Sequence, residues 1–175
     1  MKRLVSYLMV IALLLGCIGM LSACGGEEAN TYTLPEGYTM YEDEYISFAY
    51  PSHWTTTDGS TVMLQNTENT NNITVVYEAA TDMYETMTKE SFETTMVPAL
   101  EAAGMQIADA AITQHTRGDL KITEISFSTT LYGITMQQIM YMTTVSDRTY
   151  AITVTEVVSD PAIAENVFAS LSAVK

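Results

Sequence analysis

Methionine is the residue type whose chemistry and spacing stand out first in this chain. Met136, Met140 and Met142 have the same parity in a segment typical of a strand, so their side chains are expected on one face. Thioether sulfur is a soft ligand that suits Cu(I), whereas methionine in a core fills irregular space, and Ile134 on the same face favours a core. Copper handling therefore requires the three side chains to be exposed together, and burial beneath the C-terminal helix would exclude it.

The carboxylates and histidines give weaker indications of a metal or catalytic site than the methionines do. Glu42, Asp43 and Glu44 are consecutive, but a calcium loop places its oxygens at alternate positions around a glycine, so the run is interpreted as a solvated acidic segment. His53 and His115 lie far apart in the sequence and would need carboxylate partners to complete a zinc site. No metal and no cofactor are expected. A carboxylate-based hydrolase remains an alternative, which requires two acids converging in a cleft with perturbed pKa values.

The sequence contains no established catalytic or nucleotide-binding motif. There is no Gly-x-Ser-x-Gly elbow, no Gly-x-Gly-x-x-Gly and no phosphate-binding loop. No catalytic residue is therefore predicted, and the protein is expected to be non-enzymatic. Trp54 and the face formed by Met136, Met140 and Met142 are the candidate ligand-binding residues.

The first 24 residues carry the chemistry of a membrane anchor. Lys2 and Arg3 form a short positive region, and an apolar run starts at Leu8. The run ends in small residues before a cysteine, in the order Leu21, Ser22, Ala23 and Cys24. This ending resembles the lipobox of bacterial lipoproteins. The resemblance implies a thioether between the Cys24 sulfur and diacylglycerol, and removal of a signal peptide, residues 1–23, by cleavage between Ala23 and Cys24.

A membrane-spanning helix is the alternative interpretation of this segment, because the stretch from Leu4 to Ala23 is almost long enough to cross a bilayer. The small residues before Cys24, and the two glycines and two acids that follow it, favour cleavage. We therefore expect the protein to lie on the extracytoplasmic face of a cell membrane, held by lipid on Cys24. Its general character suits a Gram-positive bacterium.

Cysteine and charge content narrow the function further. Cys17 would leave with the leader and Cys24 would carry lipid, so the mature domain has no thiol for a disulfide, a metal site or a nucleophile. Seven basic and 21 acidic residues give a formal charge of −14. Without Lys2 and Arg3, five bases oppose 21 acids, a charge of −16. This excess of acids argues against nucleic-acid binding, which depends on Lys and Arg.

The rest of the chain divides into a tether and one α+β domain. Residues 24–44 show no periodicity and are expected to form an acidic flexible tether. In the domain, residues 45–175, strands are predicted at 45–50, 61–65, 73–77, 105–116, 119–131, 134–145 and 148–157. A helix at 92–103 should be broken into two pieces by Pro98 or kinked near Met96. A C-terminal helix should begin after Asp160 and run to Val174. Short connections favour a central antiparallel β-sheet flanked by helices.

Part of this domain is similar to a known family. Residues 45–54, an aromatic strand followed by Pro51 and Trp54, resemble the opening of PsbP-like domains. The strand that starts at Tyr150 and the helix that contains Phe168 fit the same pattern. The resemblance covers residues 44–175 and implies an α/β/α sandwich with a central antiparallel sheet. It also implies an accessory or binding role, and it supplies no catalytic residues.

The leading hypothesis is a non-enzymatic cell-envelope lipoprotein. Its extracytoplasmic domain would bind a protein partner or a small ligand, and lipid on Cys24 would hold it at the membrane. Copper handling by the methionine face and carboxylate-based hydrolysis are the alternatives.

Overall fold

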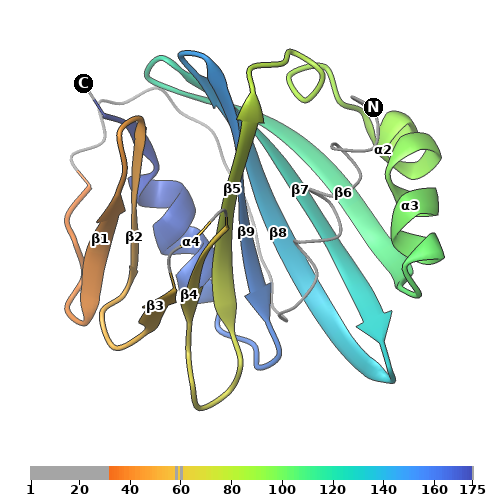
Figure 1. Cartoon of the computed structure of the whole chain (residues 1–175), viewed down its shortest axis with the longest axis horizontal. Helices are drawn as coiled ribbons and strands as arrows, with labels where there is room; N and C mark the ends of the chain where they lie inside the picture. Colours follow the sequence, from red (N-terminus) through yellow and green to blue (C-terminus); the bar gives the residue numbers. More distant parts are fainter. Residues whose placement is uncertain (1–31, 58, 60, 175) are drawn as a thin grey trace.

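Two antiparallel sheets form the framework of the computed structural model, which describes residues 32–57, 59 and 61–174 (Figure 1). The small sheet has the order β1-β2-β10, with β1 at Tyr38–Glu42, β2 at Ile46–Pro51 and β10 at Ser172–Ala173. The large sheet has the order β3-β4-β5-β9-β8-β7-β6. Its strands are β3 (Thr55–Thr57), β4 (Val62–Gln65), β5 (Asn72–Ala79), β6 (Gln106–Arg117), β7 (Leu120–Leu131), β8 (Ile134–Val145) and β9 (Arg148–Glu156).

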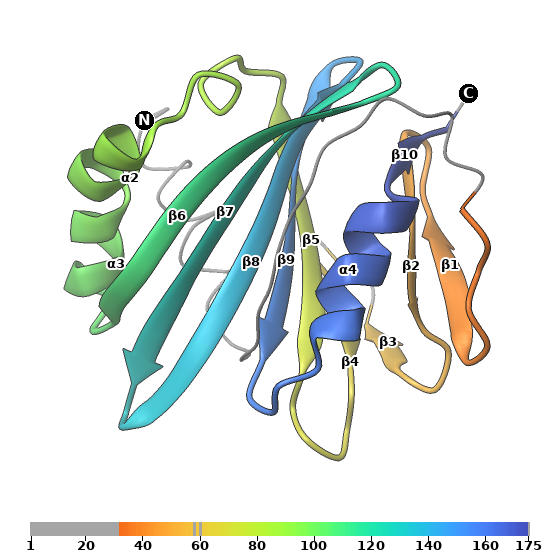
Figure 2. The ribbon, with the colours of Figure 1, turned by 180° about the vertical axis from the view of Figure 1, so that it is seen from behind.

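Helices lie on both sides of the large sheet. Helix α4 (Pro161–Ser170) and the small sheet cover one face, as Figure 2 shows from behind. Helices α2 (Lys89–Thr95) and α3 (Val97–Ala102) stand on the other side, at the β6 edge (Figure 1). No helix among the described residues is long and apolar enough to span a membrane.

Each face of the large sheet has its own core. The core on the α4 side joins β2, the sheet and the helix through fully buried side chains such as Phe48, Ile152 and Val167. The core on the α2 side joins β7 and β8 to the helices, and Phe92 packs on Phe127 with ring centroids 5.6 Å apart. Strand β9 is buried on both sides, because alternate residues of a strand point to opposite faces of the sheet.

The predicted helix at 92–103 is two helices, as its proline indicated. Met96 is the C-cap of α2 and the N-cap of α3, and Pro98 occupies the first turn of α3. A proline in the first turn lacks only an N–H that would have no partner there, so a new helix can start where the old one stops. Gly104 follows at φ +89°, a conformation that favours glycine.

The domain includes residues before the predicted boundary. Strand β1 lies within the predicted tether, residues 24–44, and pairs antiparallel with β2 from Tyr38↔Pro51 to Glu42↔Ser47. The boundary at residue 45 is therefore wrong. The C-terminal helix is also shorter than expected, because α4 ends at Ser170 and the chain then adds β10 to the small sheet.

Candidate functional site

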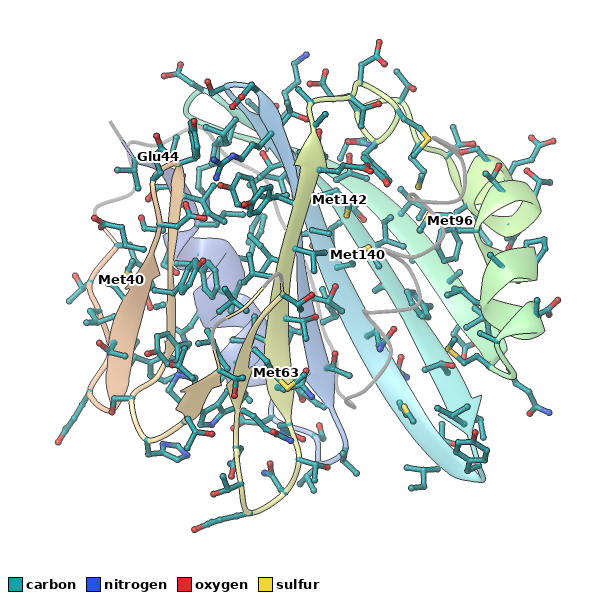
Figure 3. The ribbon with its side chains drawn as sticks, viewed as in Figure 1. Met40, Glu44, Met63, Met96, Met140 and Met142 are labelled. Carbon is teal, nitrogen blue, oxygen red and sulfur yellow. The ribbon has the colours of Figure 1, made fainter. Side chains whose placement is uncertain are left out.

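The three methionines of β8 are core residues. Met140 and Met142 are each 2% exposed and belong to the core on the α2 side, and Met136 is 5% exposed. Figure 3 shows Met140 and Met142 along β8, with Met96 beside the helices. Copper handling required these side chains to be exposed together, so that hypothesis is wrong. The helices that close this core are α2 and α3, not the C-terminal helix that the sequence indicated.

Trp54 is also a packing residue. It is 6% exposed and lies in the core on the α4 side with Ile46 and Phe48. An indole buried in this way cannot line an open ligand groove, so its assignment as a ligand-binding residue is corrected. The large aromatic surface instead stabilises the contact between the small sheet and the rest of the domain.

The histidines are on separate elements. His53 is exposed between β2 and β3, and His115 lies on β6. The His115 Nε2 atom is 3.0 Å from Glu124 Oε2, and its ring packs 4.6 Å from the Phe168 ring. Within residues 32–57, 59 and 61–174, no group of three or more His, Cys, Asp or Glu side chains is arranged to hold a metal ion.

The acidic run at residues 42–44 builds a turn. The Asp43 carboxylate accepts hydrogen bonds from the backbone N–H groups of Tyr45 and Ile46, at 2.8 and 2.9 Å, and so fixes the turn between β1 and β2. The Glu44 carboxylate lies 3.4 Å from the Arg148 guanidinium. Asp43 therefore holds the backbone of the turn, and Glu44 forms an ion pair with an arginine of the same chain.

Arg148 contacts residues of both sheets, and no sequence pattern indicated this role. Its guanidinium lies 4.4 Å from the ring centroids of both Tyr45 and Tyr77. Tyr45 precedes β2 in the small sheet, whereas Tyr77 belongs to β5 of the large sheet. Cation–π contacts on two rings make Arg148 a clamp between the sheets.

Glu156 is the one carboxylate among the described residues whose pKa is resolved as shifted. The residue is 1% exposed, and burial raises its pKa to about 9. Its Oε2 atom accepts a hydrogen bond of 2.6 Å from the Asp160 backbone N–H, just before α4. Asp160 is the N-cap of α4 but makes no capping hydrogen bond with its own side chain, and Glu156 binds the N–H of this N-cap residue itself. An inaccessible acid gives no support to the hydrolase hypothesis, which required a pair in a cleft.

Threonines cover the face of the large sheet that is opposite α4. Thr153 on β9 pairs directly with Thr74 on β5, and Thr155 follows two residues later on the same face. Thr129 on β7 has the same orientation and is paired with Met136 of β8. These four threonines, here called the threonine floor, are 0–2% exposed. None of their hydroxyls has a hydrogen-bond partner among the residues that the structure describes.

A second group of threonines on the same face is fully bonded. The Thr123 hydroxyl donates to the Tyr84 carbonyl at 2.7 Å. The Thr144 and Thr149 hydroxyls donate to the Thr81 carbonyl at 3.1 and 3.3 Å, and Thr149 Oγ1 also accepts the Thr81 N–H at 2.9 Å. This part of the face thus binds the main chain of residues 80–88.

The lipid-attachment prediction concerns residues outside those that the structure describes. Ala23 and Cys24 both precede residue 32. The assignment of Cys24 as the lipidated residue stays a prediction.

The sequence did not predict that the threonines of the floor are buried. Threonine on a strand suits a solvent-facing position equally well, so its abundance does not tell the two apart.

Comparisons with known proteins inform the fold. No protein-family model matches the chain, and no curated protein matches it. The solution structure of cyanobacterial PsbP (CyanoP) from Synechocystis sp. PCC 6803 superposes with a TM-score of 0.60 at 12% identity, covering 89% of this chain and 100% of that one. A crystal structure from Bacteroides thetaiotaomicron gives a TM-score of 0.46 at 17% identity over 74% of this chain and 45% of that one, a likeness too low to add to the argument.

The likeness to cyanobacterial PsbP shows the fold. The chain has a PsbP-like fold with a mostly antiparallel sheet and helices on both sides, as the resemblance in its sequence implied. At 12% identity, a shared fold does not establish a shared function.

Proposed function

We propose that this protein is a lipid-anchored, extracytoplasmic binding domain with no catalytic activity of its own, an accessory component of the cell envelope. The observation that carries the proposal is the structural use of the acidic side chains, since Asp43, Glu44 and Glu156 each contact a group of the chain itself.

The polar residues that a catalyst would use have structural roles. Asp43 fixes a turn, Glu44 pairs with Arg148, and Glu156 accepts a backbone N–H before α4. Binding without chemistry is therefore the function that best fits the geometry. The PsbP-like fold supports this proposal only as an analogy.

The anchor is tested by labelling cells with an alkyne fatty acid. Cys24→Ser should abolish incorporation into the protein, because the thiol is the site of thioether formation. Cys17→Ser is the matched control, since it changes the other cysteine of the leader and should leave labelling intact. Labelling that persists in Cys24→Ser would refute the lipid anchor.

The binding role is tested by crosslinking in intact cells, followed by recovery of the anchored protein and mass spectrometry. One protein recovered in stoichiometric amount, and absent from cells that lack this chain, supports an accessory subunit. Recovery of the chain alone directs the search to small ligands. If neither a partner nor a ligand is found, the binding proposal fails.

A further inference from the structure

Apolar side chains are exposed at the turn between β7 and β8. Leu131 and Ile134 form the last pair of the two strands, so the turn itself consists of Tyr132 and Gly133. Tyr132 is 96% exposed, the highest fraction for a large hydrophobic side chain among the described residues, and Ile134 is 53% exposed. Residues 131–134 are here called the hairpin tip.

The hairpin tip extends beyond the strands on either side of it. Pairing of β7 with β6 ends at Thr130, and pairing of β8 with β9 ends at Gln137. Figures 1 and 2 both show the β7–β8 turn at one end of the large sheet. The tip is therefore a projection that can meet a surface outside the domain.

Tyr132 has a backbone conformation that does not suit its side chain. Its φ is +51°, and the φ of Gly133 is +80°. A two-residue turn with both φ angles positive favours Asn or Asp followed by Gly, whereas a bulky residue is rare at its first position. Because Tyr132 breaks this preference without packing into a core, we infer that its side chain serves a contact outside the fold.

The hairpin that carries the tip is uncharged. Residues 125–146 contain no Asp, Glu, Lys, Arg or His, although the whole chain has a formal charge of −14. A charged partner would therefore find no ion pair within the hairpin, and the hairpin brings no carboxylate that anionic headgroups would repel. Next to the tip in register are Thr130, Thr135 and Gln106, whose polar side chains can form hydrogen bonds with headgroups.

We propose that the hairpin tip inserts into the surface of the lipid bilayer that holds the anchor. This inference rests on the lipid anchor of the proposed function and specifies where the domain itself meets the membrane. Tyrosine suits this place because its ring is apolar and its hydroxyl is polar, a combination enriched where membranes meet water. A protein partner fits less well, because a specific interface buries about 800 Å² on each side, far more than one turn presents.

The length of the tether keeps the tip close to lipid. The described chain begins at residue 32, so residues 24–31 join it to Cys24, a connection of at most about 29 Å. Figures 1 and 2 show the first described residues, drawn in orange, at the opposite end of the molecule's long axis from the tip. Attachment at both places lays the domain along the bilayer. Because the anchor holds lipid at a high effective concentration, a small apolar tip is sufficient.

The test uses the full lipidated chain in phosphatidylcholine vesicles, with a tryptophan in the tip as the reporter. Trp54 is the one tryptophan of the natural chain and is 6% exposed, so the parent gives a constant background. Tyr132→Trp should lose more than half of the fluorescence that the reporter adds when the acyl chains carry bromine, which quenches on contact. A reporter that keeps its fluorescence in brominated vesicles would overturn the proposal.

Met83→Trp is the matched control. Met83 is 42% exposed and follows β5, whose last residue pairs with Arg148 at the end of the sheet away from the tip. Its reporter should keep its fluorescence in brominated vesicles. Equal quenching of the two reporters would mean that lipid contacts the domain without preference for the tip, and would overturn the proposal.

Ile134→Asp, added to Tyr132→Trp, tests the apolar character of the tip. Ile134 is half exposed, so the change leaves both cores intact and places a charge where lipid is expected. A charge is costly to bury in lipid, so the reporter should recover most of its fluorescence. Quenching that Ile134→Asp does not reduce would contradict insertion of the tip.

Tyr132→Asn separates a membrane contact from a role in folding. Asparagine suits the left-handed conformation and the side chain of Tyr132 is almost fully exposed, so the midpoint of thermal unfolding should stay the same or rise. A lower midpoint would show that the ring stabilises the domain itself, which would overturn the proposal.

Flotation of the same vesicles tests the anchor separately. A chain that does not float refutes the anchor and, with it, the contact at the tip. A chain that floats while the reporter at residue 132 stays unquenched refutes the contact and leaves the proposed function standing. In that case a photoreactive residue at position 132 that crosslinks to a protein in intact cells would assign the tip to a protein contact instead.

Discussion

Glu156 is a buried acid that is neutral in the folded protein around pH 7, since burial raises its pKa from an ordinary 4.5 to about 9. Between those two pH values the folded chain holds a proton that the unfolded chain has lost. The free energy of unfolding therefore decreases as the pH rises through this interval. The stability that depends on the neutral acid is fully present below pH 4.5 and is lost as the pH passes about 9.

Glu156→Gln should remove this pH dependence. The amide stays neutral at every pH and keeps an oxygen for the Asp160 N–H, so the variant should match the parent near pH 4.5 and exceed its stability at pH 8 by more than about 1 kcal/mol, the equivalent of one pKa unit. Chemical denaturation at several pH values measures the difference. Glu165→Gln, on the exposed side of α4, is the control. Parallel stability curves for parent and Glu156→Gln would contradict the assignment.

Burial of the β8 methionines gives a second prediction at this scale. Met140→Ala should lower the free energy of unfolding by about 2–5 kcal/mol, because it leaves a cavity in the core on the α2 side. Met83→Ala is the matched control, since Met83 is 42% exposed and its loss should cost less than about 0.5 kcal/mol. Urea titration measures both, and a similar small effect for the two would argue against a packed Met140.

The methionines also show where sequence reasoning stops at the residue scale. Their parity was sufficient to place Met136, Met140 and Met142 on one face of a strand. Whether that face meets solvent or a core depends on α2, α3 and residues 80–88, which lie far away in the sequence. The contacts that bury these methionines come from segments distant in the sequence, so no local pattern could distinguish a copper site from a packed core.

At the scale of elements, Asn71 joins two loops. Its Oδ1 accepts the N–H groups of Val157 and Val158 at 2.8 and 3.1 Å, and its Nδ2 donates to the Val158 carbonyl at 2.8 Å. The side chain is completely buried. The start of β5 is thereby fixed to the segment between β9 and α4, which sets where the C-terminal helix begins.

Asn71→Ala should therefore destabilise the domain by about 1–3 kcal/mol, because two partly buried N–H groups and a carbonyl lose the side chain that pairs with them. Asn71→Asp keeps both acceptor bonds and loses the donor, so its effect should be smaller than that of alanine. Thermal unfolding of the two variants gives the order. Equal effects would mean that the bonds to the N–H groups contribute little, and Glu68→Ala in the exposed loop nearby serves as the neutral control.

The elements that the sequence predicted well are those with long internal patterns. The four strands from β6 to β9 match the expected ranges to within one or two residues, and Pro98 correctly marked the division of the helix. Short strands were missed: β1 and β10 are strands because β2 lies between them and supplies their partners. The bulge in β6 at Asp109, which has φ +55°, was not predicted either, because no glycine in the sequence marks its position.

At the scale of the molecule, the small sheet is attached to the large one by a core and a clamp. The core, with Phe48 and Trp54, contributes apolar burial that the aromatic strand pattern indicated. The clamp is Arg148 between Tyr45 and Tyr77, with Glu44 beside it. No sequence pattern links these residues, because the contacts join positions that are far apart in the chain. It closes the gap between two sheets that share no hydrogen-bonded strands.

Arg148→Met should loosen the small sheet while leaving the large one intact. Methionine keeps an unbranched apolar stem and removes both cation–π contacts and the ion pair, at a cost of about 1–2 kcal/mol. Amide hydrogen exchange should accelerate in β1 and β2 and stay slow in β7 and β8, because local stability differs between parts of a fold. Lys121→Met removes an exposed pair with Glu85 and should change neither sheet. If exchange rises equally in both sheets, the two unfold as one unit, and Arg148 stabilises the whole domain without acting as a local clamp.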